Sequence, residues 1–179
     1  MAMYILAKTR FKKQKKKWKN IKKEITKLNL HFVGKLQTNK AKDVVDLFDY
    51  VHSLENVRQA EVLSKYEKQL NKKLSYFIQI NIGNEKQKSG INSSDVKSFL
   101  EICKFKYDLN IIGLMCLPPN AISPEKYFKV MLELKTSLLK AYENQVTELS
   151  MGMSNDYIPA IHHESTFLRI GTKIFGARE

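Results

Sequence analysis

The sequence predicts an α/β fold, namely an incomplete (β/α)8 barrel of the TIM type. Strand-like and helix-like segments alternate along the chain, which is typical of a parallel sheet covered by helices. The strand-like segments, such as FIQINI and IIGLMCL, are apolar almost throughout, which indicates strands buried on both faces. Six such units are present, whereas a closed barrel of this class has eight. We therefore expect a barrel that is two units short.

The individual elements are placed by apolar spacing and by capping residues. We predict strands at Leu30–Leu36, Tyr50–Leu54, Tyr76–Ile82, Ile111–Leu117, Leu149–Met153 and Phe167–Phe175. We predict helices at Lys15–Leu28, Val57–Leu70 and Val96–Ile102, from Pro124 to about Tyr142, and from about Tyr157. Ser93, Ser94 and Asp95 are natural caps for the third of these helices, and Pro124 suits a first helical turn.

Composition indicates one globular domain. A chain of 179 residues can bury one sizeable core, and 43% hydrophobic residues with only seven Gly and four Pro are typical of a folded protein. The longest apolar runs are too short to span a membrane, and the opening MAMYILA lacks the order of a secretory signal. We expect a cytoplasmic monomer in which Cys103 and Cys116 are reduced core thiols.

The net charge of +13 is concentrated at the amino terminus. Residues 1–30 hold ten lysines and Arg10 against the single acid Glu24, so the rest of the chain carries only +3. A lysine-rich arm can bind nucleic acid, and that alternative stays open for this segment. No basic stripe with interleaved aromatic residues follows it, so we expect no nucleic-acid partner.

The ends of the last two predicted strands carry small and hydroxyl residues. In β/α barrels, phosphate groups bind at the loops after strands seven and eight, near a helix amino terminus. If the last two strands occupy these positions, Ser154 follows one of them, and Gly171 and Thr172 follow the other. We call these three residues the phosphate cradle, because their amides and hydroxyls suit an oxyanion. Each also has a plain interpretation as a helix cap or turn residue.

Familiar catalytic and metal-binding motifs are missing. The chain has no GxGxxG, HExxH or GxSxG, and no Lys-Ser or Lys-Thr pair completes a P-loop after Gly171. Its four histidines, His31, His52, His162 and His163, have no carboxylate or cysteine at ligand spacing. We therefore predict that they are packing or surface residues and that no metal is bound.

Six strings resemble a known family, in that family's order. They are HFVGKLQTNK, VHSLEN, IQINIGNEKQKSGI, IIGLMCLPP, LSMGMSNDYIPAI and LRIGTKIFGAR. They are similar to the pyridoxal phosphate homeostasis proteins, whose barrel resembles the amino-terminal domain of alanine racemases. The resemblance implies a fold-type-III barrel that holds pyridoxal phosphate through a lysine at the end of its first strand. It also implies a carrier or regulator that serves apo-enzymes without catalytic turnover, and a racemase-like enzyme is the alternative.

The resemblance further implies the cofactor-binding residues. By matching position they are Asn39, Met115, Ser154, Arg169, Gly171 and Thr172. The phosphate cradle would take the phosphate, and Arg169 would face the pyridine nitrogen. A permanently charged guanidinium there keeps the nitrogen unprotonated, which suits holding a cofactor better than stabilising a carbanion. A salt bridge at the barrel mouth is the alternative role for Arg169.

The front of the chain departs from the family. Members begin with a strand similar to AVSK, then a helix, then FGEN followed by VQEA, and none of these occurs here. The segment ILAKTRF around Lys8 is superficially similar to the AVSK strand. The 22 residues between Lys8 and His31, however, cannot hold a helix, a strand and another helix. With wobble bases chosen to fit, back-translated Met3 to Gln14 reads VYFGENKVQEA when the frame is shifted by two bases. We expect residues 1–14 to be out of frame, residues 15–179 to form one partial barrel domain, and Lys8 not to be the Schiff-base lysine.

An open barrel has unpaired edges. Without its first strands, we expect exposed edges at the strands beginning near Leu30 and near Phe167. The apolar run Tyr4–Ala7 is one short segment and cannot replace two strands. We therefore predict that the chain as written is prone to aggregation or partly molten.

Overall fold

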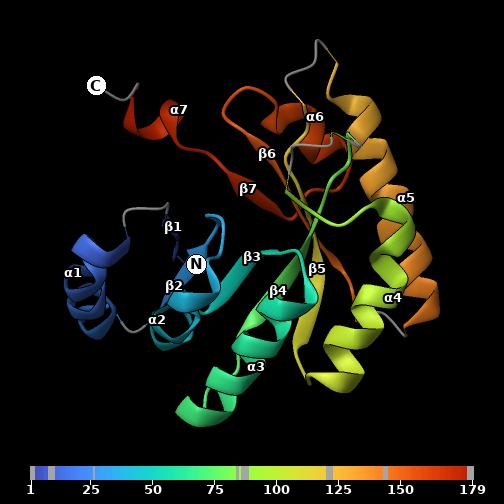
Figure 1. Ribbon diagram of the computed structural model, residues 1–179. Coiled ribbons are helices and arrows are strands. Elements are labelled where there is room, and N and C mark those ends of the chain that lie inside the picture. The colour runs from blue at the N-terminus through green and yellow to red at the C-terminus, as the bar shows by residue number, and fades with distance from the viewer. Residues whose placement is uncertain are drawn as a thin grey trace.

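The computed structural model describes residues 3–7, 11–25, 27–83, 85, 89–119, 123–142 and 145–176, with side chains from residue 16 onward (Figure 1). Its centre is a sheet of seven parallel strands in sequence order. The strands are β1 (Met3–Ala7), β2 (Leu28–Phe32), β3 (Tyr50–Leu54), β4 (Ser75–Ile80), β5 (Asn110–Cys116), β6 (Glu148–Met153) and β7 (Phe167–Arg169). Among the described residues no ladder joins β7 to β1, so the barrel is incomplete, as the sequence predicts.

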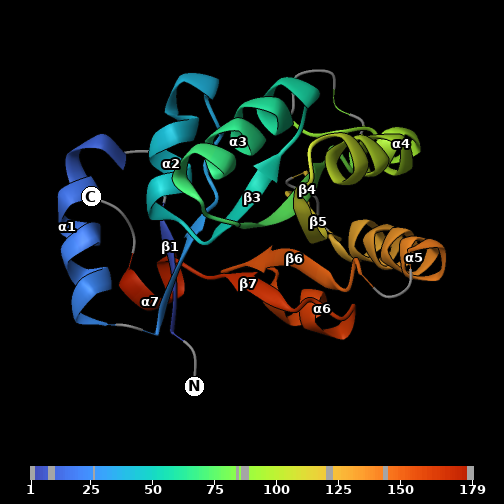
Figure 2. The ribbon, with the colours of Figure 1, turned by 90° about the horizontal axis from the view of Figure 1, so that it is seen from below.

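Helices α1 to α6 connect successive strands and lie along the outer side of the curled sheet, whereas α7 follows the last strand (Figure 2). They are α1 (Phe11–Glu24), α2 (Ala41–Leu47), α3 (Val57–Leu70), α4 (Val96–Glu101), α5 (Glu125–Ala141), α6 (Tyr157–His162) and α7 (Thr172–Phe175). Two 3-10 turns, η1 (Thr38–Lys40) and η2 (Ser93–Asp95), precede α2 and α4, and α4 continues into a π-helical turn, η3 (Ile102–Lys106). None of the described helices is both long and apolar enough to cross a membrane.

Two features correct the predicted strand pattern. β1 pairs in parallel with β2 from Met3 opposite Leu28 to Ala7 opposite Phe32, so seven strands are present and the edge expected near Leu30 is covered. Met3 and the apolar run in residues 4–7 together form this five-residue strand, and α1 supplies the crossover connection. The sheet therefore ends at β1 and β7. Whether residues 1–14 are out of frame, and whether the chain aggregates, stay predictions.

The last predicted strand is also shorter than expected. β7 ends at Arg169, and Thr172–Phe175 form the short helix α7 instead of continuing the strand. The amides of Ile174 and Phe175 donate to the carbonyl of Gly171, which closes a helical turn just after the strand. The first predicted strand similarly stops at Phe32, and the predicted helix Lys15–Leu28 lies at Phe11–Glu24.

The core lies between the sheet and its covering helices. In α3 the apolar side chains of Ala60 and Leu63 are fully buried, and Asn56 caps the helix by accepting the amide of Gln59 at 2.9 Å. Gly113 of β5 lies so close to β6 that a Cβ atom would collide with the backbone of Glu148. Cys103 and Cys116 are buried thiols, and burial raises the pKa of each to about 12.

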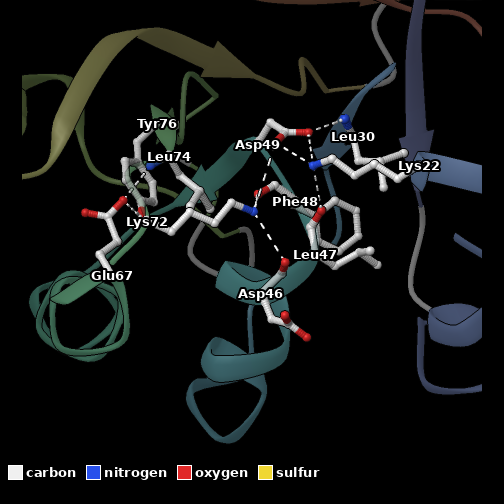
Figure 3. A network of polar contacts seen from close by, with 10 residues as sticks. All are labelled: Lys22, Leu30, Asp46, Leu47, Phe48, Asp49, Glu67, Lys72, Leu74 and Tyr76. Carbon is white, nitrogen blue, oxygen red and sulfur yellow. Dashed lines mark hydrogen bonds and ion pairs between the residues drawn. The ribbon is translucent and has the colours of Figure 1, made fainter. Parts of the chain in front are cut away.

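A polar network fixes α1 to the amino-terminal side of the sheet (Figure 3). The Asp49 carboxylate, just before β3, accepts the Leu30 amide at 2.9 Å and the Lys22 ammonium at 2.6 and 2.7 Å. Lys72 donates to the carbonyl of Phe48 at 2.6 Å and lies 4.0 Å from Asp49. At least one lysine of the basic front segment, Lys22, is thus part of the folded structure. It lies at the amino-terminal ends of the strands, the end of a β/α barrel that contributes to stability.

A buried carboxylate supports the same side of the barrel. Glu67 of α3 is 2% exposed and accepts hydrogen bonds from the Leu74 amide at 2.6 Å and the Tyr76 hydroxyl at 2.9 Å (Figure 3). Burial raises the pKa of Glu67 above its usual value, and these two hydrogen bonds oppose that shift. The residue ties α3 to the start of β4.

Candidate functional site

The ends of β6 and β7 bring two parts of the phosphate cradle together. β6 ends at Met153, and Ser154 begins the turn before α6, whereas Gly171 follows β7 and caps α7. The Oγ atom of Ser154 accepts the amide of Gly171 at 3.3 Å and the amide of Lys173 at 3.4 Å. Ser154 is 7% exposed, so its hydroxyl is held between the two loops. The predicted convergence of Ser154 with Gly171 is present.

The other side of the cradle is open. A Cβ atom added at Gly171 would have nothing within 4 Å, so an anion can approach the backbone there. The φ angle of Gly171 is −119°, which other residues can also adopt, so the absent side chain matters for access and not for conformation. Thr172 is exposed at the first position of α7. The ammonium of Lys173 in α7 lies 4.5 Å from the ring centroid of Tyr157 in α6, a contact between the segments that follow β6 and β7.

Arg169 is fixed by neutral partners. Its guanidinium donates to Oγ of Ser150 on β6 and to the carbonyl of Cys116 on β5, each at 2.8 Å. Among the ion pairs of the described residues none involves Arg169, so the salt-bridge alternative has no support there. Burial lowers the pKa of Arg169. Because a free guanidinium titrates above about 12, the group is still charged at neutral pH.

The two remaining predicted contact residues lie in different surroundings. Met115 is 1% exposed in β5, in register with Gln79 of β4 and Ser150 of β6. Asn39 is exposed in η1, after β2. No hydrogen bond described in the structure joins Asn39 to the phosphate cradle or to Arg169. Their contact with a cofactor stays a prediction, and Lys8 lies outside the described residues.

A buried hydrogen-bonded histidine pair is the part of this region that sequence reasoning missed. His31 and His52 are 0% exposed, which agrees with a packing role. They are also polar partners, because Nδ1 of His31 lies 2.9 Å from Nε2 of His52, and Nδ1 of His52 lies 2.8 Å from Oγ of Ser150. The other two histidines lie elsewhere, in the α6 region. The available signal was alternation, since His31 and His52 each stand in a short strand with apolar neighbours.

Both buried histidines are neutral at neutral pH. Burial lowers the pKa of His31 to about 4, although the charge of Asp49 raises it slightly. Burial also lowers the pKa of His52 well below its ordinary value, and His31 and the charged Arg169 lower it further. Each ring therefore has one nitrogen that donates and one that accepts a hydrogen bond.

Comparison with known proteins places the chain in a family. Residues 19–179 match the family model described as "Alanine racemase, N-terminal domain". The pyridoxal phosphate homeostasis protein of Aquifex aeolicus is 35% identical over 155 residues, which cover 85% of this chain and 68% of the relative. The protein of the same name from Synechocystis sp. is 38% identical over 154 residues, covering 84% and 71% of the two chains.

Solved structures of PipY and of an alanine racemase are similar to this chain. PipY of Synechococcus elongatus without PLP superposes with a TM-score of 0.82 at 25% identity and covers 97% of this chain and 91% of that chain. PipY with PLP bound gives a TM-score of 0.77 at 28% identity, covering 90% and 78%. An alanine racemase of Clostridium difficile, at 13% identity and a TM-score of 0.71 over 98% of this chain and 45% of its own, shares the fold. The chain belongs to the pyridoxal phosphate homeostasis proteins, within the family of alanine racemase amino-terminal domains.

Proposed function

We propose that this chain binds pyridoxal phosphate at the carboxyl ends of β6 and β7 and acts as a carrier or regulator of that cofactor. The observation that carries the proposal is the contact of Ser154 Oγ with the amides of Gly171 and Lys173. Two amides and a hydroxyl that already point to one place suit a phosphate oxygen. A solved relative, PipY, has been described with PLP bound, which supports the same ligand here.

The residues at the cradle fit a phosphate group. Ser154 Oγ accepts both amides in the present structure, and a phosphate oxygen would replace it as their acceptor. The Ser154 hydroxyl would then donate to the phosphate, since a hydroxyl can donate and accept. The open space at Gly171 allows the anion to reach the backbone, and Lys173, two residues later in α7, carries a positive charge that would favour an anion.

Arg169 would contact the ring end of the ligand. Among the described residues, two of its five N–H groups donate hydrogen bonds, to Ser150 and to Cys116, and a further N–H would donate to a ring nitrogen that accepts a hydrogen bond. When bound, the cofactor supplies an aldehyde and an electron-withdrawing ring. A charged guanidinium disfavours protonation of the ring nitrogen and so weakens the withdrawal of electrons. That property supports a carrier more than a catalyst.

The proposal includes the absence of catalytic turnover. A racemase needs acid–base groups that reach the substrate, and the histidine pair His31 and His52 is buried, neutral and stacked on aromatic rings. We further propose that the protein is a cytoplasmic monomer that passes the cofactor to apo-enzymes. An assay of alanine racemisation with added pyridoxal phosphate should give no rate above that of free pyridoxal phosphate.

Calorimetric titration tests the proposed binding. The folded chain should bind both pyridoxal phosphate and inorganic phosphate, and Ser154→Ala should weaken both by about tenfold, because a buried hydroxyl that serves a charged group is lost. Ser137→Ala is the matched control, since Ser137 is exposed on α5 and bonds only its own helix in the structure. If the folded chain binds neither ligand at millimolar concentration, the proposed function is wrong.

A further inference from the structure

Side chains from four strands form one continuous hydrogen-bonded chain inside the barrel. It begins at Arg169 of β7, passes through Ser150 of β6 and His52 of β3, and ends at His31 of β2. The three successive donor–acceptor distances are 2.8, 2.8 and 2.9 Å. Ser150, His52 and His31 are each 0% exposed, so water does not compete for the two bonds that join them, whereas Arg169 is half-buried. We call these four residues the interior chain.

The chemistry of the donors gives the interior chain one direction. A guanidinium can only donate, so Ser150 Oγ accepts from Arg169. Among the hydrogen bonds of the described residues, Nδ1 of His52, 2.8 Å away, is the one acceptor within reach of the Ser150 hydroxyl proton, and we assign the proton to that bond. A neutral His52 that accepts at Nδ1 carries its proton on Nε2 and donates it to Nδ1 of His31. Every proton in the interior chain therefore points away from Arg169.

Aromatic rings hold the two imidazoles in place. His31 stacks on Tyr50 with ring centroids 4.2 Å apart and planes at 4°, and His52 stacks on Phe77 at 4.2 Å and 17°. Phe167 lies against both imidazoles, with centroid distances of 5.7 and 5.9 Å. Rings packed in this way cannot turn freely, so the acceptor of the Ser150 hydroxyl stays in one position.

We propose that Ser150 and His52 are positioning residues that hold the guanidinium of Arg169 in one orientation. When His52 accepts the Ser150 proton, the hydroxyl cannot rotate freely, and a lone pair of Oγ stays directed at Arg169. The carbonyl of Cys116 fixes a second guanidinium nitrogen, so two anchors define the plane of the group. The proposal rests on the proposed function in one respect. The oriented guanidinium would contact the ring of bound pyridoxal phosphate.

Nitrogen NMR of the labelled full chain tests the interior chain without any ligand. The wild type should show His31 and His52 as neutral rings protonated at Nε2, and guanidinium protons of Arg169 that exchange slowly with water. A neutral His52 protonated at Nδ1, or a doubly protonated His52 at pH 7, would overturn the proposal. This measurement needs no variant, so it stands even where a substitution prevents folding.

Two substitutions of the same residue separate positioning from simple packing. His52→Phe keeps the ring and removes the acceptor, so hydrogen exchange at the Arg169 guanidinium should accelerate by about tenfold. His52→Asn places a side-chain oxygen near the position of Nδ1 and should restore slow exchange. His162→Gln is the control, because His162 is exposed on α6. Unchanged exchange in His52→Phe, or loss of slow exchange in both His52 variants alike, would contradict a positioning role.

Binding measurements connect the interior chain to the ligand. In His52→Phe, affinity for pyridoxal phosphate should fall about tenfold, whereas affinity for inorganic phosphate should change less than about twofold, since Arg169 would face the ring and not the phosphate. Equal losses for both probes would contradict the proposal. If the wild type binds neither probe, the proposed function fails, and the NMR result still decides whether Ser150 and His52 position Arg169.

Discussion

The Oγ atom of Ser154 lies 3.3 Å from the amide nitrogen of Gly171, and this contact joins the loops that follow β6 and β7. It is the geometric basis for an anion site, because the same oxygen also holds the amide of Lys173. The loop is open on its far side, where a Cβ atom at Gly171 would meet nothing within 4 Å. Affinity and stability can therefore be changed separately at this position.

Gly171→Ala should weaken phosphate binding and leave the fold intact. The added methyl group occupies the open space through which the anion reaches the amide, and the φ angle of −119° is compatible with alanine. We expect about a tenfold loss of phosphate affinity and a change in unfolding free energy below about 0.5 kcal/mol. Gly113→Ala is the opposite case, because its Cβ collides with the backbone of Glu148, and it should be strongly destabilised in a denaturant melt.

Borohydride reduction in the presence of pyridoxal phosphate should label no single dominant lysine. The expectation rests on the 22 residues between Lys8 and His31, which are too few for the helix, strand and second helix that the family resemblance implies there. Peptide mapping by mass spectrometry would show which lysines are modified. Stoichiometric labelling of Lys8 would contradict both this prediction and the hypothesis that residues 1–14 are out of frame.

Asp49→Asn should destabilise the protein through the loss of α1 docking. The carboxylate accepts the Leu30 amide and the Lys22 ammonium, and the neutral amide would leave Lys22 without its charged partner. We expect a loss of about 2 kcal/mol of unfolding free energy, in the range for charge-assisted hydrogen bonds. Lys23→Gln is the control, since Lys23 is exposed, and it should stay within about 0.5 kcal/mol. An Asp49→Asn melt that matches the wild type would show that α1 is not held by this network.

The buried histidines should make the protein less stable in mild acid. The folded pKa of His31 is about 4 and the unfolded value is 6.5, so the unfolded state binds more protons between these values. Stability therefore falls as the pH decreases from about 6.5 to about 4, by roughly 3 kcal/mol for this residue. The raised pKa of Glu67 acts in the opposite direction, because the folded state then binds more protons.

Comparison with a variant isolates the histidine contribution. His31→Asn removes the titrating ring and leaves Glu67 unchanged, so the difference between the two pH profiles reports His31 together with its effect on the pKa of His52. We expect the wild type to lose more stability than His31→Asn between pH 6.5 and 4. Parallel profiles in denaturant melts across that range would mean that His31 titrates normally in the folded protein.

Local patterns were sufficient for much of the fold. β3 and α3 have the bounds predicted from sequence, because each has a clear apolar pattern and α3 is flanked by capping asparagines. The prediction for Phe167–Phe175 was wrong in its second half. The apolar residues Ile174 and Phe175 fit a strand by composition, but the turn at Gly171, whose amide bonds Ser154 from another loop, begins a helix there. That contact spans 17 residues and has no local signature.

In the candidate site, too, one contact could be predicted from the sequence and another could not. Ser154 and Gly171 could be placed together because the loops after neighbouring parallel strands lie at one edge of a sheet. The bond between His52 and Ser150 joins residues 98 positions apart, and neither residue belongs to a motif that indicates the other. Such a partnership depends on the inward orientation of two distant strands, which sequence alternation suggests only separately for each strand.

The most direct test of the account is an amide NMR titration of the glycine-labelled chain with pyridoxal phosphate. The chain has seven glycines, so each amide signal can be followed separately. The account predicts that the Gly171 signal shifts with saturation, that inorganic phosphate shifts the same signal, and that Gly34 and Gly113 do not move. A saturable shift confined to other glycines, or no shift of Gly171 at millimolar pyridoxal phosphate, would contradict binding at the phosphate cradle.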